Sequence, residues 1–202
     1  MANENDSTEL LDTGKLEALL NELADRLSRR GIEARLYIVG GAALALAYYE
    51  EGERRLTNDV DALFFPVDEI ADEAQALAAQ HGLRPDWLNR KASQFYPPHG
   101  LPDGPTVIQR DQVSIMIGPP RLILAMKLRA ARLGRDNDDI AVLVRRCDVR
   151  TVDEAAAVLA ECYEGEENFK PVARAMVEAA LGRYDVRSAR PPFTLAPMAP
   201  RG

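Results

Sequence analysis

The spacing of apolar residues alternates between helical and strand-like in the first part of the chain. Leucines recur every three or four residues near the N-terminus and predict an amphipathic helix that ends before Gly31. Shorter apolar runs that end in Gly or Pro predict strands. The predicted elements are a helix over 15–30, a strand over 36–39, a buried helix over 42–49, a strand over 60–65, a helix over 68–81, and short strands over 106–108 and 113–117.

The remainder of the chain has only the helical period. Pro120 suits the first turn of one helix, and Thr151 and Glu154 have the spacing of a capping box at the start of another. The predicted helices cover 122–132, 137–146, 152–163 and 171–182. Residues 50–55 read as a charged turn and residues 83–105, rich in Pro and Gly, show no clear period.

This order of elements predicts an α/β (α+β) fold, in which a mixed β-sheet core has flanking helices and a C-terminal helical bundle. The 202 residues, 47% of them hydrophobic, are enough for one globular domain with a helical appendage. We predict a core over 1–118, a helical region over 119–187 and a disordered, Pro-containing tail over 188–202.

Charge and cysteine content narrow the classes of function. The net charge of -7 argues against a broad grip on duplex nucleic acid but allows a local basic rim. The chain has no C-x-x-C pair and no apolar run of the ~20 residues that a membrane span needs, and residues 1–12 are polar and acidic, unlike a signal peptide. We therefore expect a cytoplasmic protein with no membrane partner. The residues available for a basic rim are Arg84, Arg90, Lys91, Arg129, Arg132 and Arg135, although a plain helix coat is the favoured interpretation of the last two.

Gly40 and Gly41 stand at the turn from the first predicted strand into the buried helix. Because glycine has no Cβ, phosphate oxygens can approach the exposed N–H groups of such a helix N-terminus. A tight turn that binds nothing would explain the same two residues.

Asp59 and Asp61 lie two residues apart at the start of the second predicted strand, so their carboxylates face the same side. Neighbouring carboxylates repel each other unless a cation lies between them, and Mg²⁺ commonly takes one or two carboxylates plus substrate phosphates. A polar turn with a solvated Asp61 is the alternative. The apolar neighbours of Asp61 predict a buried strand, however, and a buried acid needs a partner.

This order of elements resembles the active-site motif of the DNA polymerase β-like nucleotidyltransferase superfamily. The match consists of a strand, Gly-Gly, a helix and then Thr57-Asn58-Asp59-Val60-Asp61. The 17 residues from Ala42 to Asn58 make the separation similar to that of its AbiEii toxin-type (MenT-like) branch. Two later segments support that branch. Residues 117–127 resemble its strand-Pro-x-x-Leu-x-x-x-Lys helix start, and residues 135–140 resemble its R-D-x-x-D-I element.

The resemblance implies a role for each matched residue. Gly40 and Gly41 would hold the β- and γ-phosphates of a nucleoside triphosphate, and Asp59 and Asp61 would bind Mg²⁺. Lys127, on an apolar stretch that packs its stem, would reach the triphosphate.

Three further residues have open roles. Asp136 would lie beside the metal or the acceptor, although Asp136 and Asp139 would cap the start of a helix in any case. The hydroxyl of Thr57 either steadies the acid loop of the nucleotide site or caps it locally.

One expected feature is missing from the pattern. Enzymes of this superfamily often carry a third carboxylate on a later strand that faces the first two. The matching positions here hold Ser114 and Met116, and Asp111 is the nearest acid. His81 and His99 match neither motif.

The resemblance implies transfer of a nucleoside monophosphate from Mg-NTP to an acceptor hydroxyl. In the toxin branch the acceptor is the 3′ end of transfer RNA, and a separate antitoxin protein is the partner. Three alternatives remain open: transfer to a small molecule such as an aminoglycoside, a catalytically silent fold that binds a nucleotide or a protein, and an α/β domain in which both motifs are accidental.

Overall fold

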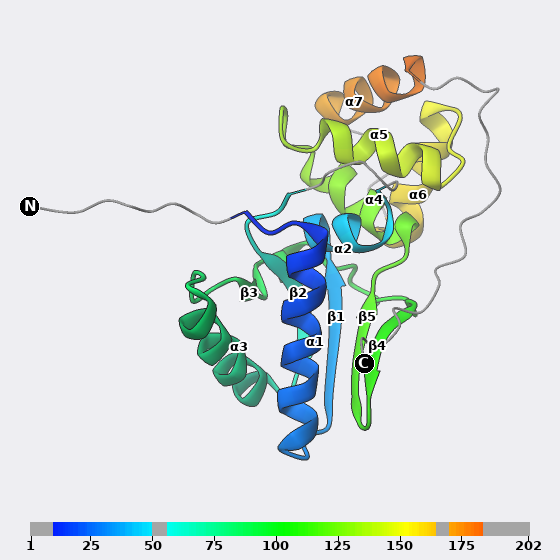
Figure 1. Ribbon diagram of the computed structural model, residues 1–202. Helices are drawn as coiled ribbons and strands as arrows, with labels where there is room; N and C mark the ends of the chain where they lie inside the picture. Colours follow the sequence, from blue (N-terminus) through cyan, green and yellow to red (C-terminus); the bar gives the residue numbers. More distant parts are fainter. Residues whose placement is uncertain (1–9, 50–55, 165–169, 184–202) are drawn as a thin grey trace, which may run out of the picture.

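The computed structural model describes residues 10–49, 56–164 and 170–183 (Figure 1). The predicted charged turn at 50–55 and the predicted tail at 188–202 lie outside these ranges. The described elements, in chain order, are α1 Thr13–Arg29, β1 Ala34–Val39, α2 Gly40–Ala47, β2 Val60–Phe65, α3 Val67–His81, β3 Leu88–Asn89, the 3₁₀ helix η1 Lys91–Phe95, β4 Thr106–Arg110, β5 Val113–Ile117, α4 Pro120–Ala130, α5 Asn137–Arg146, α6 Val152–Cys162 and α7 Pro171–Gly182.

The five strands form one mixed sheet in the order β3-β2-β1-β5-β4. The central strand β1 pairs antiparallel with β2 and parallel with β5. At the edges, β3 joins β2 in parallel and β4 joins β5 as an antiparallel hairpin. This sheet and its helices confirm the predicted α+β class with a mixed sheet.

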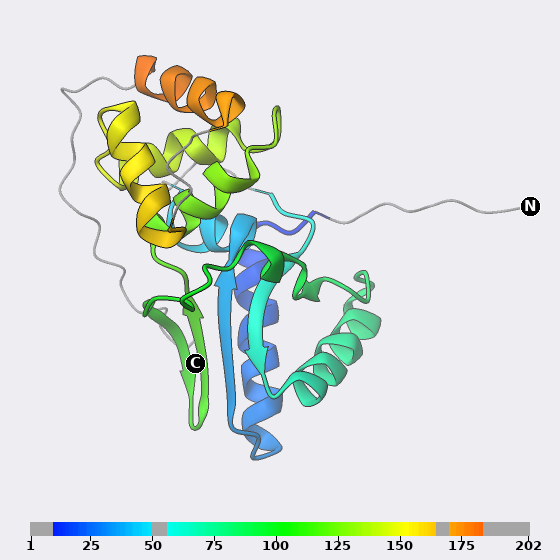
Figure 2. The same ribbon diagram turned by 180° about the vertical axis from the view of Figure 1, so that it is seen from behind.

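In the part of the chain that the structure describes, α-helices cover one face of the sheet (Figure 1, Figure 2). Helix α1 lies across it and α3 lies beside it (Figure 1), and the β2 residues on that side, Val60, Ala62 and Phe64, are buried. Seen from behind, the strands have no helix in front of them (Figure 2), and Phe65 on that side is 74% exposed. On the face that carries Asp61, Asp61 and Leu63 are half-buried and Phe65 is exposed, so the expectation of a buried strand holds fully for the helix-covered face alone. Buried and less buried residues alternate along β2 because the described helices pack on one face of the sheet alone.

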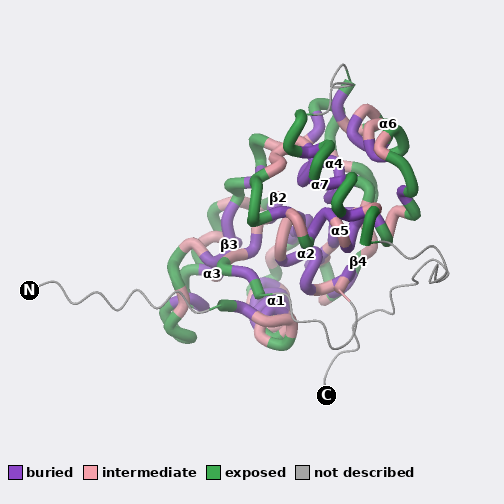
Figure 3. Tube along the Cα trace, turned by 90° about the horizontal axis from the view of Figure 1, so that it is seen from above, coloured by how far each residue is buried: buried purple, intermediate pink, exposed green. Residues whose placement is uncertain are grey.

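Helices α4 to α7 gather at the end of the sheet where β1 and β5 finish (Figure 1). Tyr48, the residue after α2, makes two hydrogen bonds: its hydroxyl donates to the carbonyl of Gly118, between β5 and α4, at 2.7 Å, and its carbonyl accepts from Arg146 Nε of α5 at 2.9 Å. From above, buried residues concentrate around α2 and exposed residues form the rim (Figure 3). The C-terminal end of α2 is thereby tied to the β5–α4 connection and to α5.

The ends of the elements follow the local signals in the sequence. Helix α3 follows Pro66 and ends at Gly82, whose φ of 65° is left-handed. The Thr151 side chain caps α6 by accepting from the Glu154 N–H. None of the described helices is long and apolar enough to span a membrane.

Candidate active site

The pairing of β1 with β2 brings the glycine turn next to the second acid. Val39, the last residue of β1, pairs with Asp61. A Cβ added to Gly40, the next residue, would lie 3.3 Å from Asp61 Oδ2, and Gly40 has a left-handed φ of 67°. Both the backbone conformation and the close approach of the carboxylate therefore favour glycine at position 40.

Gly40 and Gly41 form the first turn of α2, an eight-residue helix. No side chain caps this helix, because its N-cap residue is Val39. The first N–H groups of a helix have no partners within the helix, and the helix dipole makes this end attractive to anions. The turn next to Asp61 therefore has the features of a phosphate-binding helix N-terminus.

Asp59 and Asp61 are close enough to repel each other. Burial, followed by the Asp59 carboxylate, raises the pKa of Asp61 above its usual range. A hydrogen bond from the Ala92 backbone N–H and the charges of Lys127 and Lys91 offset this only in part. The pair is thus a half-buried concentration of negative charge that the described residues around it neutralise only in part.

The loop that holds Asp59 is tied down by its neighbours. The Thr57 hydroxyl donates to the backbone carbonyl of Asp59 at 3.0 Å, and Thr57 also pairs its backbone with Leu11. Because this bond runs only two residues along the chain, it fits both roles left open for Thr57, steadying the acid loop and capping it locally.

Sequence reasoning missed the segment that surrounds the acids. Asn89 Nδ2 donates to Asp59 Oδ2 at 3.0 Å, and Ala92 donates its N–H to Asp61. The Tyr96 hydroxyl is buried and has no hydrogen-bond partner within the described residues, and burial together with Asp61 raises its pKa to about 12. Two large apolar residues in sequence, Trp87 and Leu88, are the signal that could have indicated a strand leading to Asn89, and both are buried.

Lys127 lies in α4 and is buried, as the apolar residues around it predicted. Its Nζ contacts Asp136 Oδ1 at 2.7 Å and Asp139 Oδ2 at 2.8 Å, and Asp139 also accepts from the Tyr49 hydroxyl at 3.1 Å. Lys127 therefore joins α4 to the start of α5. It is still close enough to Asp61 to lower the pKa of that carboxyl, so the two charge clusters adjoin.

Asp136 is completely buried and holds two cations. Besides Lys127, it accepts three hydrogen bonds of 3.0 Å from the backbone and guanidinium of Arg132. Burial alone would raise the pKa of Asp136, but Arg132 and Lys127 lower it to about 2. Its side chain does not cap α5, contrary to the expectation for an acid at a helix start, because these cations engage both oxygens.

The third carboxylate is missing within the described residues. A third carboxylate that faces Asp61 would have to come from the residue just after β5. That residue is Gly118, whose N–H donates to the Ile38 carbonyl at 2.9 Å. Asp111 lies at the other end of β5, in the turn after β4, where it accepts from the Ser28 hydroxyl. Among all the residues that the structure describes, no group of three or more acidic, His or Cys side chains could hold a metal ion.

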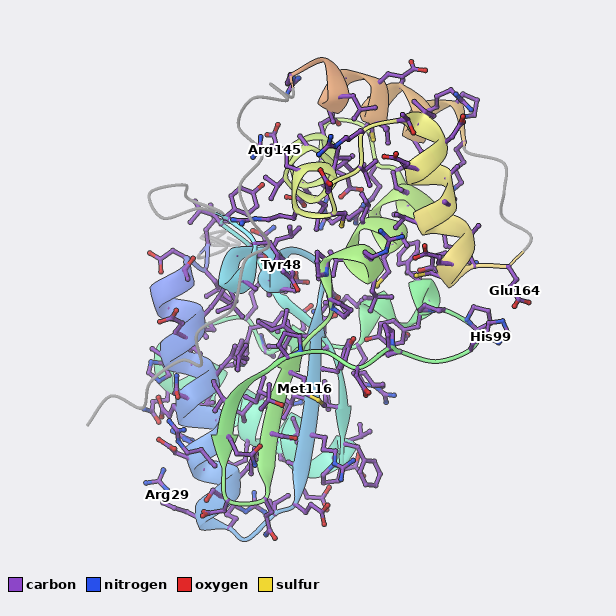
Figure 4. The ribbon with its side chains drawn as sticks, turned by 90° about the vertical axis from the view of Figure 1, so that its right-hand side faces the viewer. Arg29, Tyr48, His99, Met116, Arg145 and Glu164 are labelled. Carbon is purple, nitrogen blue, oxygen red and sulfur yellow. The ribbon has the colours of Figure 1, made fainter. Side chains whose placement is uncertain are left out.

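The two histidines lie outside this arrangement. His81, at the end of α3, contacts Glu22 at 2.8 Å, and His99 lies 3.5 Å from Glu164 in a loop away from the sheet (Figure 4). These positions agree with the prediction that neither belongs to a motif.

The chemistry of the acid pair fits Mg²⁺. Two carboxylates supply hard oxygen ligands, and Mg²⁺ usually completes its six positions with water and substrate phosphates, so a third acid is not required for binding. No protein family, curated protein or solved structure matches this chain. The interpretation of the site therefore depends on its own geometry.

Proposed function

We propose that the protein is a cytoplasmic, metal-dependent nucleotidyltransferase that moves a nucleoside monophosphate from a triphosphate to an acceptor hydroxyl. The contact between Gly40 and Asp61 carries this proposal. It puts an uncapped helix N-terminus and a carboxylate pair within reach of one triphosphate, since a Cβ at Gly40 would lie only 3.3 Å from Asp61 Oδ2.

Asp59 and Asp61 would hold Mg²⁺. Such an ion supplies neutralisation of the triphosphate and alignment of the attacking oxygen. The protein's contribution is to hold the carboxylates ready: the Ala92 N–H orients Asp61, and Thr57 steadies the backbone at Asp59. Burial and then the Asp59 carboxylate raise the pKa of Asp61, and a bound cation would relieve the repulsion between the two acids.

The N–H groups of Gly40 and Gly41 would bind the pyrophosphate as it leaves, where fixed dipoles stabilise developing negative charge. Lys127 would contribute through the electrostatic field, because its amine is engaged by Asp136 and Asp139. Phosphoryl transfer depends mainly on positioning and charge, so it needs no histidine base.

The nature of the acceptor is the next part of the proposal. The toxin-type resemblance favours an RNA 3′ end, with transfer RNA as the first candidate and an antitoxin as protein partner. The expected basic rim is partly neutralised, since Arg84 and Lys91 both pair with Asp86, at 2.9 and 2.5 Å. A cationic small molecule is therefore the competing acceptor.

A catalytically silent nucleotide-binding protein is the second candidate. Gly118 stands at the strand level where a third carboxylate would assist activation of the acceptor hydroxyl. This function predicts binding of Mg-NTP without transfer.

One experiment tests these functions together. The protein is incubated with each α-labelled NTP, Mg²⁺ and total RNA or an aminoglycoside panel, beside Asp61→Ala. Label in RNA or in a small molecule, lost in the variant, supports the enzyme and identifies its acceptor. Transfer that survives Asp61→Ala contradicts the site assignment, and binding without transfer supports the silent protein.

A further inference from the structure

We propose that Asn89 is a positioning residue for the metal-binding carboxylate: it holds one oxygen of Asp59 so that the other faces the cation. This inference rests on the proposed function, because it assumes that Asp59 is a metal ligand. It assigns a task to the 83–105 segment, which had no motif.

Asn89 is buried beside the acids, with 9% of its surface exposed. It pairs with Asp61 in the parallel register of β3 and β2, so the two side chains leave the sheet on the same face. From there its Nδ2 donates to Asp59 Oδ2 at 3.0 Å. One short strand thus brings a neutral donor to the acid pair.

The amide of Asn89 is fixed by the backbone around it. Its Oδ1 accepts from the Lys91 N–H at 2.8 Å, and its Nδ2 also lies 3.3 Å from the Asp86 carbonyl. A rotation that turned Oδ1 toward Asp59 would break these bonds and bring two acceptors together. The donor side of the amide therefore stays directed at the carboxylate.

This contact leaves the other oxygen of Asp59 for a ligand. Within the described ranges, no hydrogen bond or ion pair engages Asp59 Oδ1. A neutral amide orients the carboxylate without cancelling its charge, whereas a lysine would compete with the metal ion. Groups that orient metal ligands in this way typically account for about 10–100-fold in metal affinity.

The test measures metal binding directly, apart from activity. Mn²⁺ binding to the full chain is followed by electron paramagnetic resonance with a non-hydrolysable NTP analogue. Asn89→Ala is expected to weaken Mn²⁺ binding about tenfold or more. The Mg²⁺ concentration for half-maximal transfer should rise equally, while the rate at saturating Mg²⁺ stays near that of the wild type.

Asn21→Ala is the matched control, because the Asn21 amide likewise donates one hydrogen bond, to Glu17, and accepts another, from Arg110, but lies on α1. It should leave Mn²⁺ binding unchanged. If Asn89→Ala is unfolded at the assay temperature, Asn89→Ser gives the same comparison, since its hydroxyl is too short to reach Asp59.

The outcomes separate this inference from the function beneath it. Wild-type affinity for Mn²⁺ in Asn89→Ala or Asn89→Ser overturns the inference and leaves the enzyme proposal standing. Equal weakening in Asn21→Ala also overturns it, because the effect is then not local. A wild-type protein that binds no Mn²⁺ overturns both.

Discussion

Two clusters of charge adjoin in this protein, and they are built in opposite ways. In the helical region, Lys127 and Arg132 neutralise Asp136, and Asp139 completes the network. At the end of the sheet, Asp59 and Asp61 face the same side with only neutral hydrogen-bond donors in direct contact, among the described residues. Among the described residues, the first cluster contains the cations that balance its acids, and the second does not.

The pKa directions express the same difference. The pKa of Asp136 is lowered to about 2 although the side chain is fully buried, because two cations more than offset burial. The pKa of Asp61 is raised, because burial and the Asp59 carboxylate outweigh the hydrogen bond from the Ala92 N–H and the charges of the two lysines. A buried acid with paired cations stabilises the fold, whereas an acid pair that lacks one is suited to bind a cation from outside.

The comparison predicts the largest effect for Asp61→Asn. If Asp61 binds the metal ion as proposed, its loss should reduce the proposed nucleotide transfer by about 1,000-fold or more, which corresponds to roughly 4 kcal/mol in the activation barrier. The free energy of unfolding at pH 7 should be at least that of the wild type, because the repulsion with Asp59 is removed. Transfer assays and urea denaturation check the two parts.

Asp111→Asn is the control for this substitution, since Asp111 lies in the β4–β5 turn and bonds to Ser28. It should retain full activity. A large loss of stability in Asp61→Asn would mean that Asp61 is a structural acid like Asp136, and the distinction between the clusters would be wrong.

Asp136→Asn should act in the opposite sense, mainly on stability. It removes one carboxylate from buried Lys127 and from Arg132, and breaking a buried ion pair typically costs about 3–5 kcal/mol. Asp138→Asn changes a carboxylate that is 87% exposed and should cost less than about 1 kcal/mol. Urea denaturation of both variants tests this, and equal losses would contradict the assigned role of Asp136.

Asp136 also predicts a pH dependence. Its folded pKa of about 2 lies below that of an unfolded Asp, so its contribution is complete above the unfolded value and is lost as the pH falls toward 2. The wild type should lose on the order of 2 kcal/mol of stability from this group over that interval. Asp136→Asn should lack this part of the acid slope. A slope identical to that of the wild type would contradict the ion pairs.

Gly40→Ala sharpens the comparison at the phosphate side of the site. A left-handed conformation costs a non-glycine residue about 1–2 kcal/mol, and the new Cβ would lie 3.3 Å from Asp61 Oδ2. Gly82→Ala has the same strain, with φ of 65°, but no atom within 4 Å of its Cβ. Both should lose stability, and only Gly40→Ala should weaken Mg-NTP binding, by about tenfold in calorimetry. Equal affinities would remove the glycine turn from the site.

The elements with local signals could be predicted from the sequence. The predicted spans 60–65 and 137–146 match β2 and α5, because a proline closes the strand and acids begin the helix. The Gly40-Gly41 turn was predicted from two glycines at the end of a strand, and the closeness of Asp59 and Asp61 from their spacing of two. These features depend on neighbours in the chain, so a single sequence contains the information.

The parts set by distant contacts could not be predicted. Strand β3 has two residues, too few for any period, and its place depends on pairing with β2. The sequence around Asn89 therefore gave no indication that this residue lies beside the acids. The burial of Lys127 was foreseen, but its contacts with Asp136 and Asp139 depend on how α4 packs against α5.

Thr57→Val tests the smallest effect, that of the backbone support beneath Asp59. Removing a hydroxyl that donates to the Asp59 carbonyl at 3.0 Å should cost about 0.5–1.5 kcal/mol of stability. Thr13→Val removes a similar bond, to the Ala45 carbonyl at 3.1 Å, and should cost a similar amount. If Thr57 steadies the acid loop, Thr57→Val alone should also raise the Mg²⁺ concentration needed for half-maximal transfer by a few-fold, because Asp59 then samples orientations that bind no metal. Identical Mg²⁺ curves for the two variants would limit Thr57 to folding and leave Asn89 as the residue that orients Asp59.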